Sequence, residues 1–377
     1  YSIKDFRAIN PEYGTEEDFQ ALVDDIHSRG MKVMIDVVYN HTAHDAIYIE
    51  EHPEWYNRDE QGRPFTTVPA WQDIIDLKHP NEELWEYLIG SLTYWVQKGV
   101  DGFRCDVASL LPITFWRRAR EACAEVNPDT MWLTESVHAN FVRERRRENL
   151  FAISDSELYQ AFDMAYDYDI WPLWEAAVAG RVPMERYIEM LQLQDSIYPK
   201  NFIKMRCVEN HDQLRIQDRT GDKNKALAWI AFAAFNKGPF FIYAGQESAD
   251  DKRPSLFEID KVNWGTYELS DVHANLAGLK KDPAQVNGLL TFTAAEPCIQ
   301  AVWENGDESL YGIFNVSGCK GQVAVQLPDG TYEDLVQGDK FIIKDGQCCL
   351  PESVYIVRYA LESKPKEFTT VMMDSHV

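Results

Sequence analysis

Apolar and polar positions follow two different periods along the first two thirds of the chain. Apolar residues three or four positions apart predict amphipathic helices, and the short apolar runs between them predict buried strands. The predicted helices are Glu16–Ser28, Glu82–Lys98, Ile113–Val126, His138–Asn149, Arg181–Asp195 and Lys223–Asn236. The predicted strands are Lys32–Val38, Gly102–Val107, Met131–Glu135, Ala161–Tyr166, Ile203–Val208 and Pro239–Tyr243. Strands that alternate with helices favour a parallel sheet with helices outside it.

Two segments depart from this alternation. Residues 42–80 are long, contain prolines and aromatic residues, and predict a short inserted subdomain after the first strand. After about residue 285 the chain changes to short apolar runs separated by the turn signals NGDES, PDGTY and KDGQC. These predict an antiparallel β domain over 285–362, followed by a tail, 363–377. Residues 1–284, with the insertion, then form one α/β domain.

The composition limits the partners and the location that fit this chain. The formal charge of -24 argues against a nucleic-acid partner, because the 61 acidic side chains repel phosphate. No stretch approaches the ~20 apolar residues of a membrane helix. The seven cysteines show no disulfide-framework spacing, which indicates reduced thiols and a cytoplasmic location.

Three carboxylates stand at the ends of three predicted strands. Asp106 ends GFRCD, Glu135 ends MWLTE, and Asp212 follows the strand that leads into VENHD. The ends of parallel strands meet at one edge of a sheet, so these groups are expected to share a site. Two carboxyl groups facing one bond are what glycoside cleavage requires.

Arg104 and Asp106 are two residues apart on a strand, so their side chains point to the same face. The guanidinium then keeps Asp106 ionised, as a nucleophile must be. Glu135 ends an apolar run, where a raised pKa would let it donate a proton to a leaving oxygen. A buried Arg–Asp pair that only fixes the strand, and a glutamate that only caps the next helix, are the purely structural alternatives.

Several segments, in order, resemble the α-amylase family of glycoside hydrolases. They are DVVYNHT, GFRCDVAS, WLTES, ENHDQ and GPFFIYAGQE, preceded by the opening run DFRAINPEYGTEEDFQALVDDIHSRG, and the resemblance covers roughly residues 1 to 360. It implies a (β/α)8 TIM barrel with a short insertion after the third barrel strand and a C-terminal β-sandwich domain. The six predicted strands are two fewer than a barrel has, and this alignment places the first two strands upstream of Tyr1.

The resemblance also assigns roles. It makes Asp106 the nucleophile, Glu135 the general acid/base, and Asp212 a group that binds sugar hydroxyls in the transition state. His41 and His211 resemble the family's paired histidines on the same sugar, and Arg104 its strand arginine, with Asp36 supporting that arginine. Tyr39 could stack on a sugar ring, with packing inside the insertion as the alternative. The acids of FDMAYDYD (162–169) are interpreted as a polar rim rather than a metal site.

The implied function is hydrolysis of α-glucosidic bonds in starch- or glycogen-derived maltooligosaccharides, with retention and through a covalent glycosyl-enzyme. The alternatives are an α-glucanotransferase or an α-1,6-glucosidase on the same scaffold, and a non-catalytic interaction protein of the same fold. Val107 after the nucleophile is typical of members that cut α-1,6 bonds, and Ser109 and Leu110 stand where many endo-acting members carry Lys-His. No cofactor is expected. Asn40 is the one position that matches a calcium ligand of the family.

Overall fold

The computed structural model describes residues 2–306 and 308–360, which fall into two compact units. Within the described residues, the first unit spans 2–207 with Gly238–Phe241 and Leu256–Glu258. The second consists of Val208–Lys237, Ile242–Ser255, 259–306 and 308–360.

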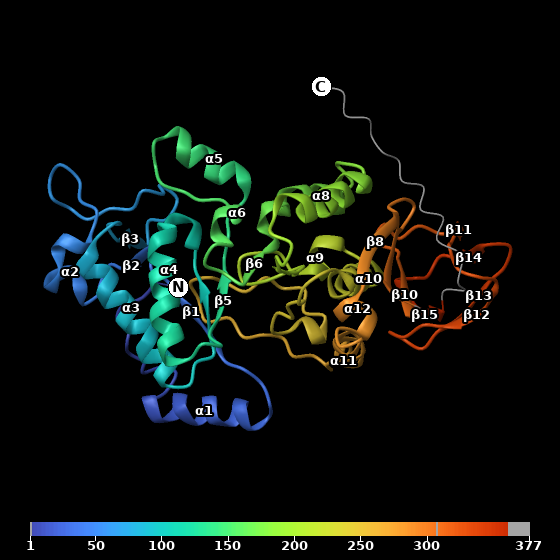
Figure 1. Ribbon diagram of the computed structural model, residues 1–377, viewed down its shortest axis with the longest axis horizontal. Coiled ribbons are helices and arrows are strands. Elements are labelled where there is room, and N and C mark those ends of the chain that lie inside the picture. The colour runs from blue at the N-terminus through green and yellow to red at the C-terminus, as the bar shows by residue number, and fades with distance from the viewer. Residues whose placement is uncertain (1, 307, 361–377) are drawn as a thin grey trace. The chain divides into compact units, whose positions relative to one another are not determined.

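A five-stranded parallel sheet forms the centre of the first unit. Its strand order is β1(Met34–Val37), β4(Gly102–Cys105), β5(Met131–Thr134), β6(Met164–Tyr166) and β7(Lys204–Met205), and all four pairings are parallel. Three of these strands, β1, β5 and β6, are labelled in Figure 1. The register places Asp36 of β1 opposite Arg104 of β4. The parallel sheet predicted from the sequence is confirmed, and its strand ends carry the candidate residues.

Each of the six predicted helices is present. They are α1(Glu16–Ser28), α3(Glu82–Gln97), α4(Ile113–Val126), α5(Ala139–Arg147), α8(Met184–Ile197) and, in the second unit, α10(Lys223–Phe235). Local chemistry fixes where three of them begin. Thr15 and Asp18 form a reciprocal capping box at α1, Asn81 accepts from the Leu84 amide at α3, and Asp222 accepts from two amides at α10.

The helices pack through one apolar face. Residues four apart on α3, Leu84, Leu88 and Leu92, are each fully buried, and α3 lies beside α4. Burial of one leucine side chain stabilises a fold by about 1.5–3 kcal/mol. The buried face of α4 consists of Phe115, Trp116, Ala119 and Cys123. These two faces cover the strands that carry the candidate carboxylates.

The insertion has its own small framework. β2(His41–Ala43) pairs antiparallel with β3(Ile74–Asp76), and between them lie α2(Tyr48–Glu51) and the 3-10 turn η1(Pro53–Trp55). Tyr48 and Trp55 are buried and their rings stack with centroids 5.7 Å apart. The insertion is therefore a packed aromatic body.

The prediction of a strand at Pro239–Tyr243 is wrong. Only a single parallel bridge joins Phe240 to Arg206 there. Pro239 lacks an N–H to donate, and the backbone turns away at Tyr243, whose carbonyl accepts from the Gln246 amide. Gly238 has φ +97°, and a Cβ at this position would lie 2.1 Å from the Lys204 carbonyl oxygen. The close approach of the two backbones therefore requires a glycine, and the ladder stops after one bridge.

Several short helices were not predicted from the sequence. In the first unit they are α6(Asp155–Leu158), the 3-10 turns η2(Ala108–Leu110) and η3(Asp167–Asp169), and α7(Trp171–Val178). In the second unit they are α9(Ile216–Thr220), the 3-10 turn η4(Gln246–Ser248), α11(Ser270–Leu279) and α12(Pro283–Asn287). Most of them hold only one or two turns, too few for a helical period to show in the sequence.

The second unit contains the antiparallel β structure expected at the C-terminal end. A four-stranded sheet has the order β15(Val354–Ala360), β10(Glu308–Phe314), β9(Ile299–Asn305), β8(Leu289–Ala294). Two further pairs join β11(Gln322–Ala324) to β14(Gln347–Cys349), and β12(Gly330–Glu333) to β13(Lys340–Ile343). α10 is buried on nearly all sides, and Trp303 Nε1 of β9 donates to the carbonyl of Phe235 at its end (2.6 Å).

Among the described residues, no helix has the length and apolar character needed to cross a membrane.

His79 joins the insertion to the core as a neutral group. Trp85 Nε1 donates to its Nδ1 (3.0 Å), so the ring proton is on Nε2, which donates to the carbonyl of Tyr39 (2.9 Å). Burial lowers the pKa of His79 to about 4, although the Tyr39 carbonyl acts in the opposite direction. The folded state therefore resists protonation of this ring.

This resistance predicts a loss of stability in acid. Because the folded pKa lies below the ordinary 6.5, the contribution of His79 is complete above that pH and is lost as the pH falls toward 4. We expect a contribution of about 2–3 kcal/mol for this partly buried ring. Denaturant unfolding of wild type and His79→Gln across this range measures it. The free-energy difference between them should shrink by that amount toward low pH, and parallel curves would contradict the assignment.

Candidate active site

Arg104 is the centre of a cluster of three carboxylates. Its Nη1 atom donates to Asp36 Oδ2 (2.9 Å) and to Asp106 Oδ1 (2.8 Å). Its Nη2 atom forms an ion pair with Glu135 Oε1 at 2.7 Å. Among the described residues, Nη2 has no partner with the geometry of a hydrogen bond. The carboxylates come from the ends of three neighbouring strands, β1, β4 and β5. One guanidinium therefore gathers the predicted nucleophile, the predicted acid and the predicted supporting aspartate.

Charge dominates this cluster. Burial disfavours the charged Arg104 side chain, but the carboxylates of Glu135, Asp36 and Asp106 more than offset it and raise its pKa well above the ordinary value. The side chains of Arg104 and Glu135 are buried, that of Asp106 is partly exposed, and that of Asp36 is half exposed. The arginine is therefore shielded from solvent, whereas solvent or a ligand can reach the carboxylates of Asp106 and Asp36.

The backbone between the two candidate catalytic residues is strained. Val107, directly after Asp106, has φ 33° and ψ 43°, a left-handed conformation that is rare for a β-branched residue. In this conformation its amide donates to Glu135 Oε2 (3.1 Å). Such strain costs about 1–3 kcal/mol and typically persists at functional sites. Here it directs a backbone donor at the predicted acid/base.

His41 lies at the start of β2 and is buried. Burial lowers its pKa, although Asp106 and Asp76 act in the opposite direction, so the ring is neutral at pH 7. Asn40 Nδ2 donates to His41 Nδ1 (3.2 Å), which places the ring proton on Nε2. No described residue accepts that proton, so Nε2 can donate to a ligand oxygen. Asn40, the position that resembles a calcium ligand of the family, thus orients His41. The expectation that the protein needs no cofactor stays a prediction.

The structure gives Tyr39 a packing role. The ring is buried against Phe6, Phe115 and Trp116. Its hydroxyl donates to the carbonyl of Leu88 (3.3 Å) and lies 2.5 Å from Ser91 Oγ, both on α3. A ring fixed in this way faces the core, so the prediction that Tyr39 stacks on a sugar has no support in this geometry.

Asp212 and His211 belong to the second unit. His211 Nε2 lies 3.3 Å from Asp212 Oδ2, and the Asp212 amide donates to Asn210 Oδ1 (2.9 Å). Both side chains are partly exposed. Their expected contact with the same sugar as Asp106 stays a prediction, because it depends on how the two units are placed.

Sequence reasoning missed one neighbour of Arg104. The guanidinium lies over the ring of Tyr166 at the end of β6, 5.4 Å from its centroid, and Nε donates to the hydroxyl (3.4 Å). Burial raises the pKa of Tyr166. The signal available was its position at the end of the next parallel strand. The acids after it form ion pairs, Asp167 with Arg206 (2.6 Å) and Asp169 with Lys204 (2.9 Å), as expected of a structural rim.

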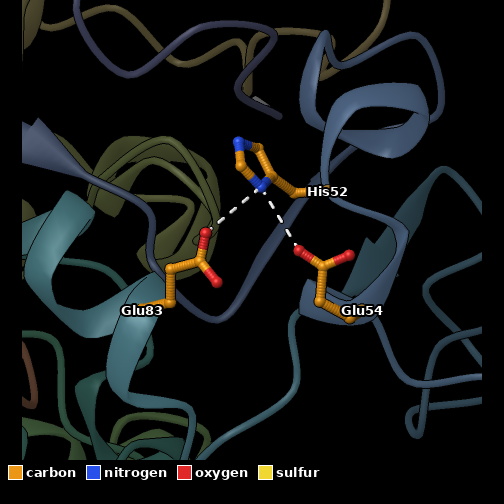
Figure 2. Close-up of side chains that lie close together, drawn as sticks. All are labelled: His52, Glu54 and Glu83. Carbon is orange, nitrogen blue, oxygen red and sulfur yellow. Dashed lines mark hydrogen bonds and ion pairs between the residues drawn. The ribbon is translucent and has the colours of Figure 1, made fainter.

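One further group has the composition of a metal site. His52 Nδ1 lies 3.2 Å from Glu54 Oε1 and 3.6 Å from Glu83 Oε1 (Figure 2). Both glutamates are exposed, and the His52 ring stacks on Trp55 with centroids 3.9 Å apart. Ion pairing and stacking account for this arrangement without a metal.

Comparison with known proteins identifies relatives of both parts of the chain. A family model described as the alpha amylase catalytic domain matches residues 1–287, and one described as the bacterial alpha amylase C-terminal domain matches residues 291–357. A crystal structure of an α-amylase from Lactobacillus plantarum is 38% identical, with a TM-score of 0.89 over 95% of this chain and 85% of that one. A maltogenic α-amylase from Thermotoga neapolitana is 30% identical, with a TM-score of 0.81 over 96% of this chain and 85% of that one.

A curated relative is longer than this chain. Neopullulanase 2 of Thermoactinomyces vulgaris is 25% identical over 92% of this chain, which spans only 62% of the length of that protein.

Replacement of Arg104 tests whether its charge stabilises the three carboxylates around it. Arg104→Gln leaves three carboxylates without their cation, and we expect a loss of about 2–3 kcal/mol in the free energy of unfolding near pH 8. The deficit should shrink toward pH 4, because protonation relieves the repulsion between the carboxylates. Arg117→Gln, on the exposed side of α4, is the control with the same charge change. A deficit that does not vary with pH would contradict the electrostatic role.

Proposed function

Because the chain belongs to the α-amylase family, whose catalytic-domain model matches residues 1–287, we propose that it cleaves α-glucosidic bonds with retention. The family consists of glycoside hydrolases, and the substrate class proposed here is maltooligosaccharides derived from starch or glycogen. The observation that carries the proposal is the single guanidinium of Arg104, 2.8 Å from Asp106 and 2.7 Å from Glu135 at neighbouring strand ends.

Asp106 acts as the nucleophile. Its carboxylate oxygen attacks the anomeric carbon, the bond from that carbon to the glycosidic oxygen breaks, and a glycosyl ester on Asp106 results. Arg104 donates to Oδ1 and so orients the carboxylate. The partly exposed side chain gives the sugar a path to this carboxylate.

Glu135 supplies and then recovers the proton. In the first step its carboxyl group protonates the departing oxygen, and in the second its carboxylate takes a proton from the water that attacks the ester. The Arg104 guanidinium and the Val107 amide stabilise the carboxylate form that the second step requires. The first step requires the protonated form, which exclusion of water by a bound sugar favours.

The remaining predicted groups bind the sugar. Neutral His41 donates from Nε2 to a hydroxyl, a role that its buried position and its hydrogen bond from Asn40 support. We propose that Asp212 and His211 bind further hydroxyls of the same ring. A hydrogen bond to a hydroxyl that strengthens as the ring flattens lowers the barrier rather than the substrate affinity.

Two observations bear on location. Cys105, Cys123, Cys298 and Cys348 are buried free thiols, which is typical of a reducing compartment. One relative is named an intracellular maltogenic amylase, from Bacillus subtilis. We therefore propose a cytoplasmic enzyme.

The alternatives differ in what reaches the glycosyl ester or in which linkage is cut. A transglycosylase uses a sugar hydroxyl instead of water, and an α-1,6-glucosidase uses the same groups on another bond. Relatives of this chain are named neopullulanase, maltogenic α-amylase and cyclomaltodextrinase. These names are compatible with each alternative reaction on the proposed substrate class. A non-catalytic protein of this fold would not need Asp106 and Glu135 on one guanidinium.

Removal of the nucleophile tests the mechanism. Asp106→Asn keeps the size of the side chain but cannot form the ester, so kcat on maltotetraose should fall by about 10³-fold or more. Asp129→Asn, an exposed aspartate in the loop before β5, is the control and should retain activity. Activity of Asp106→Asn within about 10-fold of wild type, with unfolding unchanged, would refute the assignment.

The products define the reaction. With maltotriose to maltoheptaose we expect shorter maltooligosaccharides, released first as the α anomer in an NMR time course, because two displacements retain configuration. Isomaltose and pullulan report on α-1,6 and mixed linkages. Products longer than the substrate would establish transfer, cleavage of isomaltose would establish α-1,6 specificity, and initial release of the β anomer would exclude the retaining mechanism.

A further inference from the structure

A second candidate binding site lies in the first unit, in a cavity beside α5 and α6. Its volume is about 460 Å³, within the range of about 300–1,000 Å³ typical of small-molecule sites. Its lining includes the arginines of α5 together with Ser154, Asp155 and Asp169. α5 and α6 can be located by their labels in Figure 1. None of these side chains takes part in the proposed cleavage.

The positively charged residues of the lining are Arg143, Arg146 and Arg147. They stand at i, i+3 and i+4 on α5 and therefore share one face of the helix. Arg146 is engaged, since it donates to Glu157 Oε2 (2.7 Å) and to the carbonyl of Ala152 (3.1 Å). Arg143 and Arg147 make no ion pair or side-chain hydrogen bond with the rest of the described chain. In a chain with a formal charge of -24, two uncommitted guanidiniums on one cavity are an unusual concentration of positive charge.

The lining also offers oxygen acceptors, and the charge of these carboxylates is largely balanced. Lys204 is fully buried, and its ammonium binds Asp155 and Asp169, the latter at 2.9 Å. Ser136 Oγ donates to Asp155 Oδ2 (3.2 Å), the oxygen that Lys204 also contacts. Among the described residues, no donor reaches Asp155 Oδ1. A ligand with hydroxyl groups could donate to this oxygen without bringing further charge.

We propose that this cavity binds a small phosphorylated polyol, of the sugar-phosphate class. The phosphate lies between Arg143 and Arg147, where two guanidiniums match the charge of a phosphate dianion and its several acceptor oxygens. The hydroxyl groups of the ligand face Ser154 and Asp155. The proposal goes beyond the proposed cleavage, since it assigns a ligand to side chains which that reaction does not use.

The cavity is also lined by a residue close in sequence to the predicted acid/base, Glu135. Val137, two residues after Glu135, contributes to its lining, and Ser136 donates to Asp155, another lining residue. A ligand in the cavity therefore contacts the segment that carries the predicted acid/base.

Calorimetric titration of the full chain tests the proposal with glucose 6-phosphate, inorganic phosphate and glucose. Glucose 6-phosphate should bind most tightly, and glucose should not bind at the same concentrations. The double variant Arg143→Gln/Arg147→Gln should weaken binding of glucose 6-phosphate at least about 10-fold, because it removes two charge-assisted contacts. The control Arg117→Gln/Arg181→Gln makes the same charge change at exposed positions outside the cavity and should alter affinity by less than about 2-fold.

The outcomes separate the parts of the proposal. No binding, or equal weakening by both double variants, would overturn the site. Unchanged affinity in Arg143→Gln/Arg147→Gln would place glucose 6-phosphate elsewhere, and that result also overturns it. Equal affinity for inorganic phosphate would overturn the assignment of a sugar. Denaturant unfolding of both double variants shows whether they are folded, and no arm depends on turnover, so failure of the cleavage mechanism leaves this test intact.

Discussion

The contact of Arg104 with three carboxylates is the interaction on which the candidate site depends. A buried guanidinium is costly to desolvate, and here Asp36, Asp106 and Glu135 compensate for that cost. The carboxylates in turn stay close together only because the cation lies between them. Removal of the cation leaves like charges close together, and removal of the carboxylates leaves a buried charge unpaired. The arrangement is therefore mutually dependent, and the sheet must hold it in register.

The parallel sheet meets this requirement through its register. Asp36 lies opposite Arg104 in the ladder, and Glu135 follows the strand on the other side of β4. A shift of one residue would turn Arg104 to the helix-facing side and Cys105 toward the carboxylates. Cys105 is fully buried among apolar side chains, so such a shift would place charge in the core. The apolar packing of α3 and α4 thereby selects the register that assembles the polar site.

Much of this could be predicted from the sequence because the signals were local. α1 begins and ends where its apolar periodicity indicates, and the spacing of Arg104 and Asp106 predicted a shared face. The strand at Pro239–Tyr243 failed because an apolar run does not reveal that Gly238 and Pro239 limit the pairing. The burial of Tyr39 depends on α3, some fifty residues later in the chain, and no local pattern encodes that contact. The left-handed conformation of Val107 was likewise hidden, since its residue type predicts extended backbone.

A second buried cation is compensated by carboxylates in the same way as Arg104. Lys204 of β7 lies between Asp155, the first residue of α6, and Asp169, the last residue of η3, as Arg104 lies between its carboxylates. Hydrogen bonds of the Ser136 hydroxyl link the two clusters. Ser136 is the next residue after Glu135, and its hydroxyl donates to Asp155 and to the carbonyl of Tyr166, whose ring lies beneath Arg104. A lysine in a strand gives no sequence signal of this kind, because its burial follows from acids in segments that only the fold brings together. Glu135 is thus paired with a buried arginine, and the residue after it, Ser136, is hydrogen-bonded to a cluster around a buried lysine.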